Sequence, residues 1–209
     1  LAIEPLDNAN DLPPIVMSPG FGLAGHIFLT TADGRPGWAY TFLGGGHSTY
    51  LIDRSHTSRT GFDVFAFNDV RNGRAEPGSQ PRFVLWLDER IWTRWGLGPS
   101  FGEAFDDGQF PVASARQLMG AFAPVVSESV PLRDQARGNV EGLIDLLERI
   151  GPAIVLTHSA SGRDGFQLAA RRPDLVEGIV TIEPVGCDPE QADALSGIPV
   201  LGVFGDHLE

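Results

Sequence analysis

The chain has 209 residues, enough for one domain with a sizeable core, and its contents of 42% hydrophobic and 20% charged residues are ordinary for a globular protein. The formal net charge of −12 argues against nucleic acid as a partner, because binding to phosphates needs clustered Lys or Arg. A single cysteine excludes an internal disulfide, and no spacing of residues is typical of a zinc site.

The sequence leaves the compartment undetermined. No apolar run approaches the roughly 20 residues of a membrane span, and residues 1–14 lack the basic-then-apolar layout of a signal peptide. We therefore expect either a cytoplasmic protein or one whose targeting segment has been removed for export. All 15 basic residues are arginines, which indicates a GC-rich bacterial source. We expect Cys187 to be a small buried residue rather than a reactive one.

The first quarter of the chain predicts a parallel βαβ unit. Residues 1–14 show no periodicity and predict an irregular lead-in. Residues 15–17 predict a strand, and a glycine-rich loop at 18–23, a short helix at 38–43 and a second strand at 48–53 follow it. This order favours a right-handed crossover, which places the loops after the strands at the ligand-binding edge of the sheet.

Residues 54–130 are expected to form an insertion, a cap or pocket wall, within a single domain that spans residues 1–209. The segment is much longer than one crossover helix requires. It holds three of the four tryptophans, Trp86, Trp92 and Trp95. Such aromatic residues can form a subsidiary core or line an apolar pocket, and we expect most in the core and one or two at a pocket. Residues 83–110 could also supply the apolar surface of a homodimer.

The most informative stretch begins with the apolar run at 153–156, a predicted buried strand that is followed at once by a helical pattern. The segment from Thr157 to Ser161 resembles the Gly-x-Ser-x-Gly pattern of a nucleophile elbow, in which Ser159 would be the exposed serine. Small residues are needed at both flanking positions because strand and helix nearly touch there. The alternative interpretation is an ordinary strand-turn-helix with a serine near the helix N-cap.

Elements on both sides of this stretch complete an α/β pattern. An amphipathic helix with apolar residues at 140–147 precedes it and ends at Gly151. Strands are predicted at 178–182 and 199–204. Glu183 follows the first of these two strands, and Asp206 follows the second.

With these elements in place, the chain resembles an α/β-hydrolase, and more narrowly the bacterial esterase-713-like family. The resembling stretches occur in the same order along nearly the whole chain, at 31–53, 107–111, 157–162, 182–184 and 198–209. The resemblance implies a mainly parallel sheet with helices on both faces. It also implies that the domain continues with a last strand after residue 209, and that further strands precede Leu1.

The resemblance assigns roles to individual residues. Ser159 matches the nucleophile and Glu183 the acid that orients the catalytic histidine. The loop from Gly20 to Gly22 matches the oxyanion-hole segment, so the backbone N–H groups of Phe21 and Ala160 are candidate oxyanion donors. The candidate substrate-binding residues are Gly22, Leu23, His158 and Trp86.

The general base is not identifiable from the sequence. Hydrolases of this fold carry serine, acid and histidine in that order, with the histidine after the last strand. The five histidines present are His26, His47, His56, His158 and His207. Only His26 and His56 are in predicted loops from which they could approach Ser159, and we expect the base to lie beyond Glu209. Asp206 is the alternative acid, although we expect Asp206 and His207 to form a structural pair.

The sequence therefore predicts a serine hydrolase that cleaves small apolar carboxylic esters through an acyl-enzyme on Ser159, with no metal or organic cofactor. A non-catalytic ligand-binding protein of the same fold is the main alternative. A haloalkane dehalogenase is disfavoured, because such enzymes normally have Asp where Ser159 stands.

Overall fold

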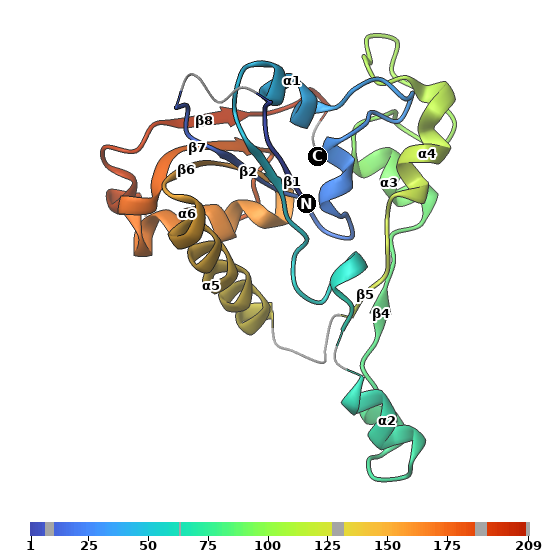
Figure 1. Cartoon of the computed structure of the whole chain (residues 1–209). Coiled ribbons are helices and arrows are strands. Elements are labelled where there is room, and N and C mark those ends of the chain that lie inside the picture. The colour runs from blue at the N-terminus through green and yellow to red at the C-terminus, as the bar shows by residue number, and fades with distance from the viewer. Residues whose placement is uncertain (7–10, 63, 127–131, 187–191, 208–209) are drawn as a thin grey trace.

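A six-stranded sheet forms the centre of the computed structural model, which describes residues 1–6, 11–62, 64–126, 132–186 and 192–207 (Figure 1). The strand order is β1-β3-β2-β6-β7-β8, and every neighbouring pair is parallel except β1 with β3. The strands are β1 (Ala2–Ile3), β2 (Ile15–Ser18), β3 (Thr49–Leu51), β6 (Ala153–His158), β7 (Val176–Ile182) and β8 (Val200–Val203). This mainly parallel sheet confirms the predicted α/β class.

Helices cover both faces of the sheet (Figure 1). Helices α5 (Leu132–Ile150) and α6 (Gly162–Arg171) pack against one face, on a core that includes Val16 and Val155. Helix α1 (Trp38–Gly44) and the short 3₁₀ helix η1 (Gly25–Phe28) pack against the other face, on a core that includes Ile15 and Met17. Alternate residues of β2 thus point into opposite cores, as the pleat requires. Within the described ranges, no helix has the length and apolar character needed to cross a membrane.

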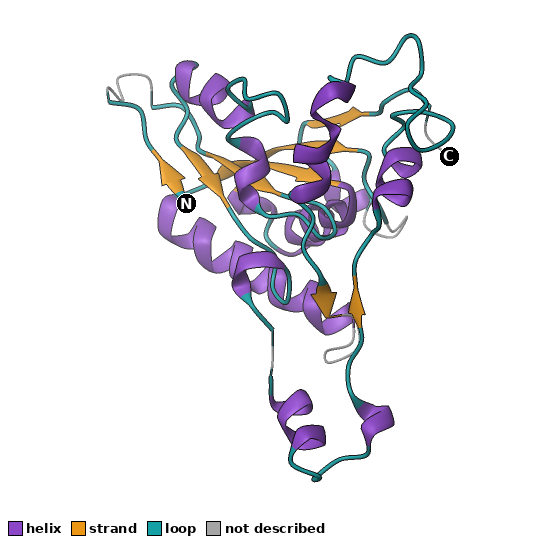
Figure 2. Ribbon diagram, turned by 90° about the vertical axis from the view of Figure 1, so that its right-hand side faces the viewer, coloured by secondary structure: helices purple, strands orange, loops and turns teal. Residues whose placement is uncertain are grey.

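The segment predicted as an insertion lies beside the sheet and extends away from it. A ribbon of two antiparallel strands, β4 (Phe83–Val84) and β5 (Val125–Val126), projects from the body, and α2 (Phe65–Arg71) lies at its far end (Figure 2). Nearer the sheet, α3 (Asp88–Arg94) and α4 (Ala115–Gly120) surround a separate core. Trp92 is buried in this core, as expected for most of the aromatic residues.

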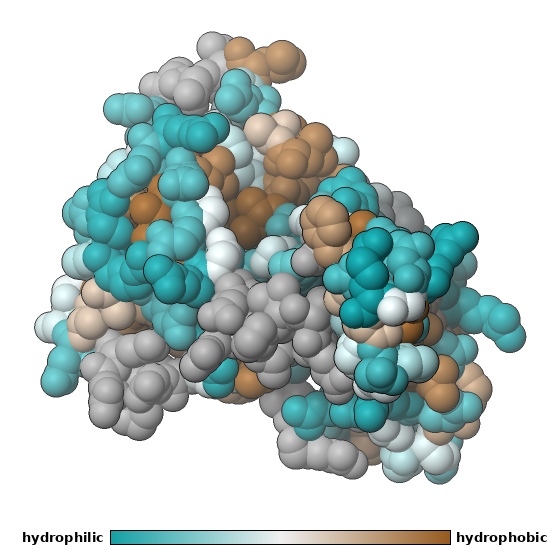
Figure 3. Space-filling view, turned by 90° about the horizontal axis from the view of Figure 1, so that it is seen from below, coloured by the Kyte–Doolittle hydropathy of each residue, from teal (hydrophilic) through white to brown (hydrophobic). Residues whose placement is uncertain are grey.

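Several apolar side chains of this segment are exposed. Phe83, Leu85 and Leu87 are each about half exposed or more. In the view from below, hydrophilic side chains cover much of the visible surface and hydrophobic ones show in patches between them (Figure 3). The structure describes a single chain, so the homodimer remains a prediction.

Two predicted boundaries were wrong. The lead-in is not wholly irregular, because Ala2 and Ile3 pair with β3, and the Leu1 backbone nitrogen donates to the Leu51 carbonyl at 3.0 Å. Two residues are too short a run to show a period in the sequence. The sequence of residues 112–122 predicts a single helix that Pro124 ends, whereas the structure has a 3₁₀ turn, η4 (Val112–Ser114), followed by α4. Cys187 lies outside the described residues.

A buried ion pair connects α6 to the loop after β3. Asp164, on α6, is 1% exposed, and its Oδ2 accepts a hydrogen bond from the Arg54 Nε at 3.0 Å. The Asn139 amide of α5 also donates to this oxygen, at 3.2 Å, while its own oxygen accepts from the backbone N–H of Ser55 at 2.9 Å. Burial raises the pKa of the Asp164 carboxyl, and the Arg54 charge acts in the opposite direction. The network fixes α6 against two separate elements.

The first turn of α6 packs closely against the loop after β7. A Cβ atom placed on Gly162 would lie 2.6 Å from the Pro184 Cβ and 3.0 Å from its Cα. These distances are shorter than van der Waals contact, and one of the two atoms belongs to the backbone. Glycine at position 162 therefore permits the loop that carries Glu183 to approach the start of α6.

Gly162→Ala should lower the free energy of unfolding by about 1–3 kcal/mol, because the added methyl group overpacks the contact with Pro184. Gly142, inside α5, is the matched control, since an added Cβ there would meet no atom within 4 Å. Gly142→Ala should stabilise the protein by about 0.5–1 kcal/mol. Urea denaturation of both variants measures the difference, and equal effects would contradict the close contact.

Candidate active site

Ser159 and Glu183 follow immediately after the ends of two adjacent strands. His158 and Ile182 form the last register pair between β6 and β7, so the next residue of each strand stands at the same level of the sheet. Both residues have a left-handed backbone, with φ of 52° at Ser159 and 45° at Glu183. This region is sparsely populated by residues other than glycine, and such strain is concentrated at functional sites. The backbone thus turns sharply at both positions.

These two residues line the same cavity at the carboxyl edge of the sheet. Its volume is about 140 Å³. The insertion contributes Trp86 and Trp95 to its wall, while Val185 and Phe204 come from the loops after β7 and β8. Four apolar or aromatic side chains, together with Arg94 of α3, therefore surround a hydroxyl and a carboxylate.

The loop after β2 lies directly against Ser159. A Cβ atom on Gly20 would be 3.1 Å from the Ser159 Cβ and 2.8 Å from the His158 Nδ1, so a larger residue would displace the elbow. The Gly22 carbonyl accepts a hydrogen bond from the backbone N–H of Ala123 at 2.8 Å, which fastens the loop to the insertion. The Phe21 ring packs on Trp86 with centroids 5.4 Å apart. The predicted oxyanion segment and the predicted nucleophile are thus neighbours.

Backbone hydrogen bonds fix the loops around the cavity to one another. The Ser159 carbonyl accepts from the N–H of Val185 at 2.9 Å. The Glu183 N–H donates to the Val203 carbonyl at 2.9 Å, and the Glu183 Oε1 accepts from the Gly205 N–H at 3.1 Å. The loop that carries Glu183 is therefore held by the elbow on one side and by the end of β8 on the other.

His158 precedes Ser159 and also lines the cavity. Its ring packs edge-on against Trp95 with centroids 5.3 Å apart. Burial lowers the pKa of His158 to about 4, and within the described part of the chain its Nδ1 has no hydrogen-bond partner. The ring is therefore neutral near pH 7.

The chain is 38% identical to a structure described as the atomic-resolution structure of a novel bacterial esterase, with a TM-score of 0.87 over 93% of this chain and 61% of that one. This chain has the α/β-hydrolase fold and is similar to an esterase of that fold. It is also 35% identical over 176 residues to "Probable secreted lipase phiG" from Fungal sp. (strain ATCC 74256), which covers 83% of this chain and 45% of the lipase. This α/β-hydrolase chain thus spans less than two thirds of either relative. No family model matches it.

No described histidine makes a hydrogen bond to Ser159. His26 is exposed in η1, and the His47 Nδ1 is 2.8 Å from the Pro13 carbonyl oxygen. His56 lies in a turn with φ of 58°, and its buried Nδ1 has no partner among the described residues. Among the described residues, none of these three rings is hydrogen-bonded to the elbow serine.

The expected pairing of His207 with Asp206 is not formed. The His207 Nε2 is 2.9 Å from the Asp107 Oδ1, and its ring stacks on Phe105 with centroids 3.7 Å apart. His207 has a left-handed φ of 56°, and its side chain turns toward the insertion instead of toward its chain neighbour. This hydrogen bond and the ring stacking fasten the loop after β8 to the insertion.

The predicted substrate-binding residues separate into two groups. Trp86 and His158 line the cavity with Ser159. Gly22 and Leu23 are buried behind it, and Leu23 packs into the core of the insertion. Sequence reasoning missed Phe204 and Val185 as lining residues. Their position directly after strand ends was the available signal, since loops at this edge form the sites of α/β proteins.

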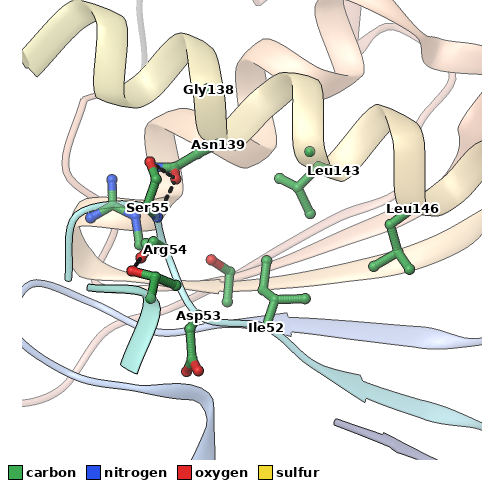
Figure 4. Close-up of a pocket in the computed structure, with 11 residues that line it drawn as sticks. Ile52, Asp53, Arg54, Ser55, Gly138, Asn139, Leu143 and Leu146 are labelled. Atoms are coloured by element: carbon green, nitrogen blue, oxygen red, sulfur yellow. Dashed lines mark hydrogen bonds between the residues drawn. The ribbon is translucent and has the colours of Figure 1, made fainter. Parts of the chain in front are cut away.

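A second cavity, of about 290 Å³, lies between the loop after β3 and α5 (Figure 4). Its charged groups are already paired, because Arg54 binds Asp164 and the Asp53 Oδ1 accepts from the Gly25 N–H at 2.7 Å. Its apolar wall consists of Ile52, Leu143 and Leu146. No group of three or more His, Cys, Asp or Glu residues among the described residues could hold a metal ion.

The low pKa of His158 predicts a pH-dependent stability. As the pH falls below 6.5, the unfolded chain takes up a proton at this ring while the folded protein does not until about pH 4. The free energy of unfolding should therefore fall by about 2 kcal/mol between pH 7 and pH 5 through this group alone. Urea denaturation of His158→Gln should show a correspondingly smaller loss over this range.

His26→Gln removes an exposed ring and serves as the control, with the full loss seen in the unmodified protein. An equal loss in His158→Gln would contradict the buried, neutral state of that ring.

Proposed function

We propose that this protein is a serine hydrolase that cleaves carboxylic esters, with Ser159 as the nucleophile. The observation that carries the proposal is the left-handed Ser159 at the junction of β6 and α6, in one cavity with Glu183 and against the Gly20 loop. A strained turn of this kind projects a serine hydroxyl above the sheet. The esterase and lipase relatives support ester hydrolysis as the reaction class.

In the proposed reaction, the Ser159 Oγ attacks the ester carbonyl carbon while a histidine removes the hydroxyl proton. The tetrahedral intermediate collapses, the alcohol leaves with that proton, and Ser159 remains acylated. Water then attacks the acyl group by the same steps. Glu183 orients the histidine and stabilises its charged form.

The histidine in this proposal lies outside the 209 residues. None of the described histidines makes a hydrogen bond to Ser159, and the chain spans 61% of the esterase structure that it matches. The Glu183 carboxylate lies in the cavity with one oxygen bound to Gly205 N–H. Its other oxygen is the proposed acceptor for the incoming histidine N–H.

The proposed oxyanion hole consists of the backbone N–H groups of Ala160 and Phe21. Ala160 is the middle residue of the short 3₁₀ turn η5 (Ser159–Ser161) that leads into α6, and Phe21 is fixed between Gly20 at the elbow and Trp86. A hydrogen-bond donor of this kind is typically worth about 2.7–4 kcal/mol of transition-state stabilisation. Only the peptide groups take part, so the side chains at these positions are free to shape the pocket.

The proposed substrate is a small ester with an apolar acyl or alcohol group. The two tryptophans, Val185 and Phe204 present apolar surface to the reacting atoms. A cavity of about 140 Å³ admits only a short chain or a single ring, at least in the described part of the protein. The lipase relative is named as secreted, and an exported location is one of the two that the sequence leaves open.

A non-catalytic binding protein is the second candidate, because no described histidine makes a hydrogen bond to the Ser159 side chain. Such a protein would retain the cavity and bind an ester without cleaving it.

A fluorophosphonate probe separates these two functions, since only an activated serine reacts with it. The full-length protein should become labelled at Ser159 and hydrolyse p-nitrophenyl acetate, and Ser159→Ala should abolish both. Ser79→Ala, at an exposed serine in the insertion, should leave both unchanged. Binding of the ester without labelling or turnover would favour the binding protein.

Glu183→Gln should lower kcat on the order of 10⁴-fold, because a neutral amide no longer holds the histidine in the correct tautomer or stabilises its charge. The amide oxygen can still accept the bond from Gly205, so the loop should keep its position. Asp206→Asn should change kcat little. Steady-state kinetics of the two variants decides between the carboxylates, and the reverse ranking would assign the acid to Asp206.

A further inference from the structure

The last register pair between β2 and β6 lies two residues before the candidate nucleophile. The register pairs Ser18 with Thr157, and the Ile154 N–H donates to the Pro14 carbonyl at 2.9 Å. In a parallel ladder the donors on one strand recur every second residue, so this register brings the His158 N–H opposite the Ser18 carbonyl. The register pairs between the two strands end at Ser18 and Thr157, and the strands then separate into the Gly20 loop and the elbow.

The Ser161 hydroxyl binds both groups of this last rung. Its Oγ accepts a hydrogen bond from the His158 N–H at 2.9 Å and lies 2.9 Å from the Ser18 carbonyl oxygen, to which it can donate. The His158 carbonyl oxygen is a second acceptor, at 3.0 Å. Ser161 is fully buried, so water does not compete for these bonds. The hydroxyl thus connects the end of β6 to the end of β2, and Ser161 and Ser18 are 143 residues apart in sequence.

Ser161 stands where the common elbow pattern has glycine. Glycine would give strand and helix the same room but could not bind the end of β2. Here the Ser161 hydroxyl makes its hydrogen bonds to the backbone of His158, next to Ser159, and to the end of the strand that leads into Gly20. The Ser18 side chain has no part in the link, because its own Oγ is buried without a partner among the described residues.

We propose that Ser161 is a positioning residue, whose hydroxyl braces the last rung between β2 and β6 and thereby sets the distance from Ser159 to the loop that carries Phe21. The proposal rests on the proposed function, since that loop is the proposed source of an oxyanion donor. A change of a few tenths of an ångström in this spacing misaligns the N–H of Phe21 with the oxyanion, which forms only in the transition state.

The test is the rate of phosphonylation by a fluorophosphonate in the full-length protein, followed as one exponential with a rate and an amplitude. The rate reports the alignment of nucleophile and oxyanion donors, and the amplitude reports the folded fraction. In Ser161→Ala and Ser161→Gly the rate should fall about tenfold or more, in line with the loss of buried hydrogen bonds. The kcat for p-nitrophenyl acetate should fall with it, while KM changes little.

Thr49→Val is the matched control. Thr49 lies in β3 of the same sheet, is fully buried, and has a hydroxyl without a hydrogen-bond partner in the described part of the chain. The valine variant removes a buried hydroxyl away from the elbow and should keep the rate of the unmodified protein. A lower amplitude at an unchanged rate in both Ser161 variants would show a merely structural role and overturn the proposal.

Amide hydrogen exchange at His158 gives a second readout that needs no activity. In Ser161→Ala this amide should exchange at least tenfold faster than in the unmodified protein and in Thr49→Val. If the unmodified protein is not labelled at all, the proposed hydrolase function fails. The hydrogen-bonded link between β2 and β6 through Ser161 is then tested by the exchange rate of the His158 amide alone. Unchanged exchange in Ser161→Ala would overturn it.

Discussion

The ion pair between Arg54 and Asp164 is the constraint on which the arrangement of the site depends. Removing two charges from water costs several kcal/mol each, and attraction between them offsets that cost only in good geometry. Here the carboxylate of α6 receives both a guanidinium and an amide, from two different elements. Because Asp164 lies on the helix that begins just after Ser159, the pair fixes the direction in which that helix leaves the elbow. The close contact of Gly162 with Pro184 then brings the Glu183 loop to the same place.

Much of the fold could be predicted because its signals are local. The apolar run at 153–156 lies in the buried strand β6, and the small residues from Ser159 to Ser161 form the expected turn. In a parallel sheet, the residues that follow adjacent strands lie at the same edge. The sequence alone therefore predicts that Ser159 and Glu183 lie close together. The esterase-like resemblance added the order of the parts and is supported by the structural relative.

The remaining features depend on contacts between distant parts of the chain. Arg54 and Asp164 are 110 residues apart, and His207 meets Asp107 across 100 residues. No period or motif in the sequence marks such pairs, and the adjacency of Asp206 and His207 suggested a pairing that the backbone does not allow. The two-residue strand β1 was missed for a different reason, since its pairing partner β3 defines it and its own sequence does not. The general base remains unassigned within the described chain.

The left-handed backbone at Ser159 restricts which residue can serve as a nucleophile here, independently of chemical reactivity. Threonine carries the same hydroxyl group, but its β-branched side chain clashes with the backbone at φ near +50° far more than serine does. A chemically equivalent alcohol is therefore excluded by conformation. Asparagine and aspartate tolerate this region best among residues with a side chain. Substitutions that keep the turn at position 159 would therefore favour these two residues, which lack the serine hydroxyl.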